Sequence, residues 1–175
     1  MIKTATTYGV ISGAIIIASM MLGLLTSDMD GFFASEYFGY LIMLIALSMI
    51  FIGIKRHRDI ELGGVIKFLP AFGLGLGISA VAGIVYVAVW EVYLASTNFA
   101  FINDYTTGLI DAKKAEGLSG AALDSFIAEM DELKAGYAKP YVRLPMTFLE
   151  IFPVGVVISL ISAALLKNPK LLPAR

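Results

Sequence analysis

The sequence contains no cysteine and a single histidine, and these two shortages exclude several kinds of site. Without cysteine, neither a disulfide framework nor a thiolate metal site can form. The one histidine, His57, stands among arginines in the segment KRHRD, far from the glutamates of the apolar stretches. The nucleophile elbow, the HExxH motif, the phosphate loop and the dinucleotide fingerprint of common enzymes are also missing. We therefore expect no catalytic residue, no metal site and no cofactor.

Charged residues are scarce as well: they make up 15% of the 175 residues, whereas 58% are hydrophobic and the mean hydropathy is +0.83. Such a composition lies outside the range of soluble domains. Four apolar stretches approach or exceed the roughly 20 residues with which a helix crosses a bilayer. They cover residues 8–25, 37–54, 68–95 and 144–166, without the alternating polarity of a transmembrane β-strand. We predict an all-α membrane protein, a single domain over residues 1–175, with four transmembrane helices of which the first is not cleaved.

The cations are unevenly distributed between these stretches. Lys3 precedes the first, the segment KRHRD and Lys67 follow the second, and Lys167, Lys170 and Arg175 follow the fourth, whereas the short loop SDMDGFFASE has no cation. Because cytoplasmic loops carry an excess of Lys and Arg, both termini and the loop after the second stretch are expected to be cytoplasmic. The basic cluster is explained by this topology, so we expect no nucleic-acid partner.

The long segment between the third and fourth stretches, residues 97–142, is predicted to be a small helical extracytoplasmic insertion. It contains two amphipathic patterns, separated by Gly117 as a natural helix stop and Ser119 as a helix cap. The apolar positions are Phe99, Ile102, Tyr105, Leu109 and Ala112 in the first pattern and Leu123, Phe126, Ile127, Met130, Leu133 and Tyr137 in the second. These faces can cap the bundle, lie on the outer leaflet or dock a partner protein.

Small residues recur at helical spacing in two of the apolar stretches. Gly9 and Gly13 are four positions apart in the first; in the third, Gly73 and Gly77 repeat this spacing and Ser79 with Gly83 continues it. Such spacing lets helix backbones approach closely in lipid. We expect these glycines to pack the bundle internally, with a homodimer face as the alternative.

Two acidic residues lie inside the apolar stretches. Glu91 stands near the outer end of the third stretch beside Trp90 and Tyr86, and Glu150 lies in the fourth, about two helical turns after Arg143. Ionisable groups within spans usually face the bundle interior or a wet cavity. We predict that these five residues form an intramembrane polar cluster, with Glu150 directed inward. The cluster can be structural, can bind a solute, a proton or a lipid headgroup, or can be catalytic.

The end of the second stretch forms a basic turn. Lys55, Arg56 and Arg58 lie where cations complement a helix C-terminus, and Asp59 can pair with one of them. Topology and contact with anionic lipid explain this turn, and recognition of a cytoplasmic partner is the alternative.

Three stretches resemble a bacterial membrane-protein family, the domain of unknown function 4199. They are IFIGIKRHRD followed by GG, VYVAVWEVY, and TFLEIFPVGVVISLISAALL; with NDY and AKPYVR in the insertion, the resemblance covers residues 8–167. It implies four spans in a bacterial inner membrane and no established activity. The residues Lys55, Arg58, Asp59, Trp90, Glu91, Glu150 and Pro153 match the family's pattern.

From these features we expect a non-enzymatic integral membrane protein, a subunit or scaffold of an envelope assembly. Its partners would be the lipid bilayer and either further copies of the chain or another membrane protein. The alternative is a small transporter or channel component with a polar site at Glu91 and Glu150. A lipid-modifying membrane enzyme is the third class.

Overall fold

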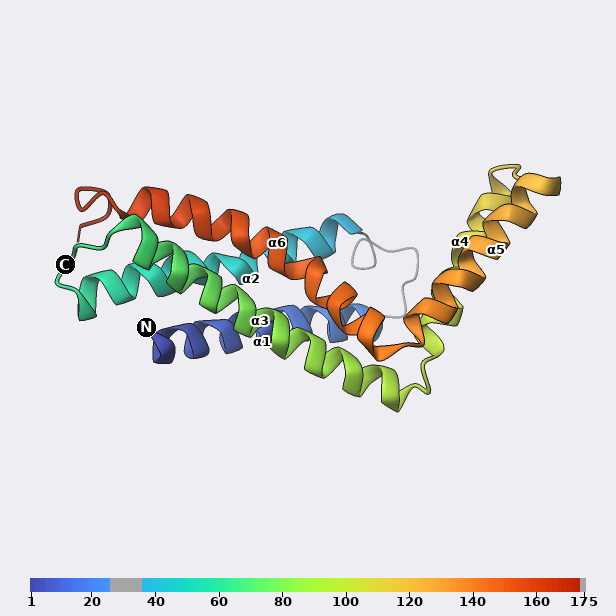
Figure 1. Ribbon diagram of the computed structural model, residues 1–175, viewed down its shortest axis with the longest axis horizontal. Coiled ribbons are helices and arrows are strands. Elements are labelled where there is room, and N and C mark those ends of the chain that lie inside the picture. Colours follow the sequence, from blue (N-terminus) through green and yellow to red (C-terminus); the bar gives the residue numbers. More distant parts are fainter. Residues whose placement is uncertain (26–35, 174–175) are drawn as a thin grey trace. The chain divides into compact units, whose positions relative to one another are not determined.

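The computed structural model describes residues 1–25 and 36–173, and these residues form helices without any strand (Figure 1). The predicted all-α class is therefore confirmed. The elements are α1 (Ile2–Leu25), α2 (Glu36–Arg56), the π-helix η2 (His57–Glu61), α3 (Phe68–Ser96), α4 (Ala100–Ala115), α5 (Gly120–Tyr137) and α6 (Pro140–Leu166). The loop SDMDGFFASE, apart from its Glu36, and Arg175 lie outside the described residues.

Four of these helices, α1, α2, α3 and α6, are long and apolar enough to cross a membrane. They correspond to the four predicted stretches, although α1 begins at Ile2 and α6 at Pro140, both earlier than predicted. Proline is favoured at the first position of a helix because the N–H it lacks has no partner there. The chain therefore reads as a membrane protein.

The chain divides into two compact units. The bundle unit comprises Met1–Val87 and Phe148–Arg175, and the hairpin unit comprises Ala88–Thr147. The hairpin unit contains α4 and α5 together with the last turns of α3 and the first turns of α6.

The core of the bundle unit is built from α1, α2, α3 and α6, with Ile66 from the connection between η2 and α3. Its buried side chains are aliphatic, and four of them are alanines. They are Ile16, Ala46, Leu47, Ile50, Ile54, Ile66, Ala71, Leu74, Ile78, Ala82, Ile151, Ala163 and Leu166. In lipid the driving force for such packing is close van der Waals contact, because the surroundings are as apolar as the core.

Helix α1 approaches α3 through two glycines. A Cβ placed on Gly9 would lie 2.5 Å from Cβ of Val81 and 2.9 Å from the carbonyl oxygen of Ile78. A Cβ on Gly13 would lie 2.7 Å from Cγ1 of Val85. Any side chain at these two positions would force the helices apart, so both glycines pack the bundle internally.

The glycines of α3 differ from the predicted series. A Cβ on Gly83 would lie 2.6 Å from the Phe148 ring. One on Gly77 would lie 3.3 Å from Cβ of Ala5, which is tighter than most Cβ contacts and would require Ala5 to shift slightly. Gly73 does not pack the bundle internally as expected, because a Cβ there would meet no atom within 4 Å among the described residues. Because Gly73 and Gly77 are four residues apart, the sequence predicted that both pack against a neighbouring helix, but Gly73 is exposed.

Helix α3 also approaches α6 through small residues, of which the sequence pattern indicated only Ser79. A Cβ on Gly75 would lie 2.7 Å from Cβ of Ser159, and a Cβ on Gly155 would lie 2.7 Å from Cβ of Ser79. The glycine of each helix thus receives the serine of the other. Ser159 is satisfied within its own helix by donating to the carbonyl of Gly155 at 2.7 Å.

In the hairpin unit, α4 ends as the sequence predicts, at a glycine. Gly117 has φ of +93°, its N–H donates to the carbonyl of Lys114, and the next N–H, of Leu118, donates to that of Lys113. This pair of bonds is the Schellman motif, which satisfies carbonyls at a helix end. Ser119 precedes α5 as predicted, but its side chain makes no capping hydrogen bond.

The burial pattern of α5 follows its predicted face: the six apolar positions are buried or half-buried, and its acidic residues are exposed. The predicted face of α4 requires correction. Phe99 precedes the helix, Tyr105 and Ala112 are exposed, and Thr106 is fully buried. The Thr106 hydroxyl donates to the carbonyl of Ile102 at 2.8 Å, which allows a polar residue to occupy the buried position.

Candidate functional site

The most strongly bound charged residue of the hairpin unit is Arg143, in the first turns of α6. Its Nε lies 2.6 Å from Oε1 of Glu91 and its Nη2 lies 2.7 Å from Oε2, so the guanidinium holds both carboxylate oxygens. Arg143 is 3% exposed. Paired hydrogen bonds of this kind are the strongest that arginine and carboxylate form.

The remaining contacts of Arg143 join it to the end of α5. Nη1 donates to the carbonyl of Tyr137 at 2.9 Å, and the guanidinium lies over the rings of Phe99, at 4.9 Å, and Tyr137, at 5.7 Å. A cation is favourable at a helix C-terminus and over an aromatic ring. One side chain thus connects the end of α3, the start of α4, the end of α5 and the start of α6.

Trp90 completes this arrangement within the hairpin unit. Its Nε1 donates to the hydroxyl of Tyr137 at 2.7 Å, and its ring meets the ring of Phe101 edge to face, with 4.8 Å between the centroids. Trp90 is 7% exposed. We name Trp90, Glu91, Phe101, Tyr137 and Arg143 the arginine clamp, because each of them contacts Arg143 or the residues that it holds.

Glu150 and Tyr86 belong to the bundle unit. The Tyr86 hydroxyl donates to Oε2 of Glu150 at 3.3 Å. Glu150 is exposed, on the same side of α6 as the exposed residues Pro153, Val157 and Leu160. Of the five residues predicted to form one cluster, Glu91, Arg143 and Trp90 share a network in the hairpin unit. In the bundle unit, Glu150 bonds to Tyr86.

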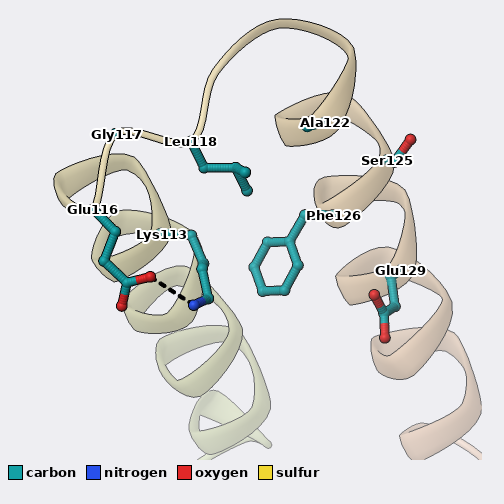
Figure 2. A pocket seen from close by; sticks show the side chains of 8 residues that line it. All are labelled: Lys113, Glu116, Gly117, Leu118, Ala122, Ser125, Phe126 and Glu129. Carbon is teal, nitrogen blue, oxygen red and sulfur yellow. Dashed lines mark hydrogen bonds and ion pairs between the residues drawn. The ribbon is translucent and has the colours of Figure 1, made fainter.

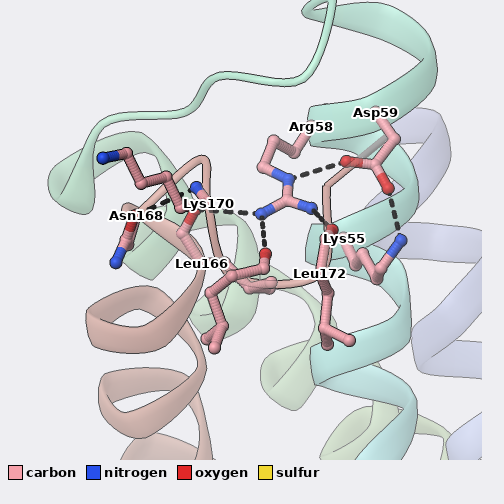
Figure 3. A network of polar contacts seen from close by, with 8 residues as sticks. Lys55, Arg58, Asp59, Leu166, Asn168, Lys170 and Leu172 are labelled. Carbon is pink, nitrogen blue, oxygen red and sulfur yellow. Dashed lines mark hydrogen bonds and ion pairs between the residues drawn. The ribbon is translucent and has the colours of Figure 1, made fainter. Parts of the chain in front are cut away.

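The basic turn of the bundle unit is built around Arg58, which is completely buried (Figure 3). Its Nε lies 2.7 Å from Oδ1 of Asp59, and Lys55 pairs with the other oxygen of that carboxylate. The far side of the guanidinium donates to the carbonyls of Leu166, at 3.4 Å, of Leu171, at 3.1 Å, and of Leu172. Arg58 thus fastens the C-terminal end of α6 to η2.

The residues of the basic turn differ in how far a lipid headgroup could reach them. Arg58 has no exposed surface and Asp59 is held by two cations, so neither is available to a headgroup. Arg56 is the exposed cation of the turn. The carbonyl partners of Arg58 lie more than a hundred positions later in the chain, which no local pattern indicates.

A second polar contact at η2 was not predicted. Nδ1 of His57 lies 2.9 Å from Oε2 of Glu61, and the hydroxyl of Thr4 donates to Oε1 at 3.1 Å. The amino terminus of Met1 is 3.8 Å from the same carboxylate. Glu61 therefore ties the first turn of α1 to the end of η2.

A cavity of about 550 Å³ lies at the tip of the hairpin unit (Figure 2). Leu118 and Phe126 point into the space between α4 and α5, and Lys113 at its edge forms an ion pair with Glu116 at 2.6 Å. Ser125 and Glu129 also line it. Within the described parts of the chain, no group of three His, Asp or Glu residues could hold a metal ion.

Comparison with known families identifies the group to which these residues belong. The family described as "Protein of unknown function (DUF4199)" matches residues 7–168, so the chain belongs to this family. Neither a curated protein nor a solved structure matches the chain.

Proposed function

We propose that this family member is a non-enzymatic subunit or scaffold of a membrane assembly, with the α4–α5 hairpin as the part that contacts other proteins. The observation that supports the proposal is the use made of the buried cations. Arg58 and Arg143 both bind helix-end carbonyls and a neighbouring carboxylate. Contacts of this kind stabilise the fold, and within the described residues neither arginine lies beside a cavity where a substrate could react.

The hairpin unit offers a surface suited to such a role. The apolar positions of α5 are buried or half-buried, whereas Asp124, Glu129, Asp131 and Glu132 are exposed. A row of carboxylates on a rigid helix can direct a basic partner surface into register. The arginine clamp fixes the base of the hairpin, so that this surface is presented on an ordered element.

The proposed orientation puts the hairpin outside a bacterial inner membrane and both termini in the cytoplasm. It is supported by the cations at both termini and in the basic turn. Because the chain has no cysteine, single cysteines can report the orientation. A membrane-impermeant maleimide should label Ser119→Cys in intact cells, and should label Lys170→Cys only after the membrane is opened. The reverse pattern would refute this topology.

The subunit role can be tested by extracting the protein in native lipid nanodiscs and measuring the mass of the intact complexes by native mass spectrometry. We expect further copies of the chain or a second protein in a fixed ratio. Replacing Asp124, Glu129, Asp131 and Glu132 by the matching amides should release that second protein. A matched control exchanges the same number of exposed charges on the hairpin elsewhere, at Asp104, Asp111, Lys114 and Glu116. Single chains with a bound small molecule would instead favour a transporter.

The transporter or channel component remains a second candidate because of Glu150. This carboxyl group is exposed within a membrane-spanning helix, a place where ionisable residues commonly serve transport. Glu91, the other acid predicted for such a site, is held by Arg143 and has a structural explanation. Under this candidate, Glu150→Gln abolishes the cellular phenotype while the protein still folds; under the subunit proposal the phenotype depends on the hairpin instead.

A further inference from the structure

Glu150 lies within the part of α6 that crosses the hydrocarbon core. Lys167, directly after the end of α6, is the first charged residue that follows Glu150 in the chain. At about 1.5 Å of rise per residue, the separation is roughly 25 Å, less than the roughly 30 Å thickness of the hydrocarbon. With Lys167 at the cytoplasmic surface, Glu150 is still inside the bilayer.

The surroundings of Glu150 supply little to stabilise a negative charge. Tyr86 of α3 donates one hydrogen bond at 3.3 Å. Along α6, the neighbouring turns place Met146, Pro153 and Val154 beside it, and none of these is ionisable. Among the described residues, no Lys, Arg or His lies within ion-pair distance of Glu150.

Glu91 provides the contrast within the same pair of helices. Its two oxygens lie 2.6 and 2.7 Å from the guanidinium of Arg143, which neutralises the charge of an ionised carboxylate. Glu150 has one neutral hydroxyl at a longer distance. A single hydroxyl replaces only part of the hydration that a carboxylate loses in lipid, whereas a neutral carboxylic acid loses much less.

We propose that Glu150 is a proton-binding site within the membrane. Its carboxylate takes a proton from the aqueous phase and holds it at neutral pH, with Tyr86 as its hydrogen-bond partner, and returns it when water or a stronger base reaches the carboxyl group. No other bond is made or broken. The proposal does not rest on the subunit role, because a proton-bearing carboxyl can serve helix association as well as transport.

Infrared spectroscopy of the whole protein in lipid vesicles tests this directly, since the C=O stretch of a neutral carboxylic acid is separate from that of a carboxylate. At pH 7 we expect a neutral-acid band that Glu150→Gln removes. The matched control is Glu91→Gln, which should leave the band in place because Glu91 is ionised. A spectrum in which Glu150→Gln removes only carboxylate absorption would overturn the proposal.

A chemical probe keeps the test decisive if Glu150→Gln fails to fold. Dicyclohexylcarbodiimide dissolves in lipid and reacts with protonated carboxyl groups: the carboxyl oxygen bonds to the central carbon while the proton moves to nitrogen, and the adduct rearranges to a stable acylurea. In the unaltered protein at pH 7, peptide mass spectrometry should find the label on Glu150 and not on Glu91. Labelling should fall as the pH is raised. Label on Glu91 with none on Glu150 would refute the assignment.

Discussion

The helices of the bundle unit and those of the hairpin unit are joined by different kinds of interaction. In the bundle unit, α1 meets α3 through Gly9 and Gly13, and α3 meets α6 through paired glycines and serines. In the hairpin unit, aromatic rings and the ion pair of Arg143 join the helix ends. Helices that are apolar on all sides gain little from covering a particular face, so close fit determines their packing. Amphipathic helices bury a distinct stripe, and larger side chains can fill the space.

The two units nevertheless share one device, a buried arginine at a helix end. Arg143 binds the last carbonyl of α5, and Arg58 binds carbonyls at and beyond the end of α6. They differ in their acids. Glu91 comes from another helix and has Arg143 as its ion-pair partner. Asp59 is adjacent to Arg58 in the sequence and pairs with both Arg58 and Lys55. Loss of Arg143 should therefore strand a charge, whereas loss of Arg58 should not.

The largest effect is expected from Arg143→Met. Removing one partner of a buried pair leaves the other uncompensated, and we expect a loss of about 3 kcal/mol in the hairpin unit, the lower end of the usual range because Glu91 is partly exposed. Trp90, the only tryptophan, reports this unfolding by fluorescence. The double variant Glu91→Leu with Arg143→Met should regain most of the loss. Equal instability of the single and double variants would mean that the ion pair is not the cause.

A smaller effect is expected from Arg58→Met, about 1–3 kcal/mol, because Asp59 keeps Lys55 while the carbonyls at the end of α6 lose their donor. The released C-terminal segment should be cut faster by trypsin after Lys167 and Lys170. Arg56→Met is the matched control, since Arg56 is the exposed cation of the same turn. Similar cleavage rates in the two variants would contradict the fastening role of Arg58.

Within the bundle unit, Gly9→Ala should cost roughly 1–3 kcal/mol, because the new methyl group would overlap Val81 and the Ile78 carbonyl. The matched control is Gly73→Ala, because a Cβ at this position would meet no neighbouring atom of the described residues. It should stabilise the helix by up to about 1 kcal/mol, since alanine favours a helix more than glycine does. Thermal unfolding in detergent measures both. If the two variants shift the midpoint in the same direction, close approach of α1 and α3 is not what makes Gly9 sensitive.

The smallest change in stability is expected from Tyr86→Phe, about 1 kcal/mol or less, because one hydrogen bond to an exposed group is lost. Its spectroscopic effect should be clearer. The neutral C=O band of Glu150 should move to higher frequency when its hydrogen-bond partner is removed. An unchanged band would mean that Tyr86 does not bond to Glu150 in the membrane.

How far the sequence predicted the site differs from one residue to the next. The sequence predicted that Glu91, Trp90 and Arg143 belong to one polar cluster, and the three residues do belong to one network of hydrogen bonds. The predicted cluster contained both acids together with Arg143, and spacing along α6 could not show which acid Arg143 binds. The missed partner of both Trp90 and Arg143 is Tyr137, which the sequence presented only as the last apolar position of an amphipathic helix.

The sequence by itself determined the helical class, the four membrane-crossing stretches, the buried face of α5 and the stop at Gly117. Each depends on composition, on periodicity along one helix or on the conformational freedom of one residue. Tertiary structure alone decided that Gly75 and not Gly73 packs, that Arg58 binds the distant carbonyls of Leu166 and Leu171, and that Glu150 bonds to Tyr86. On a helix that is apolar all round, no polarity pattern distinguishes the face that meets protein from the face that meets lipid, and only the neighbouring helices do so.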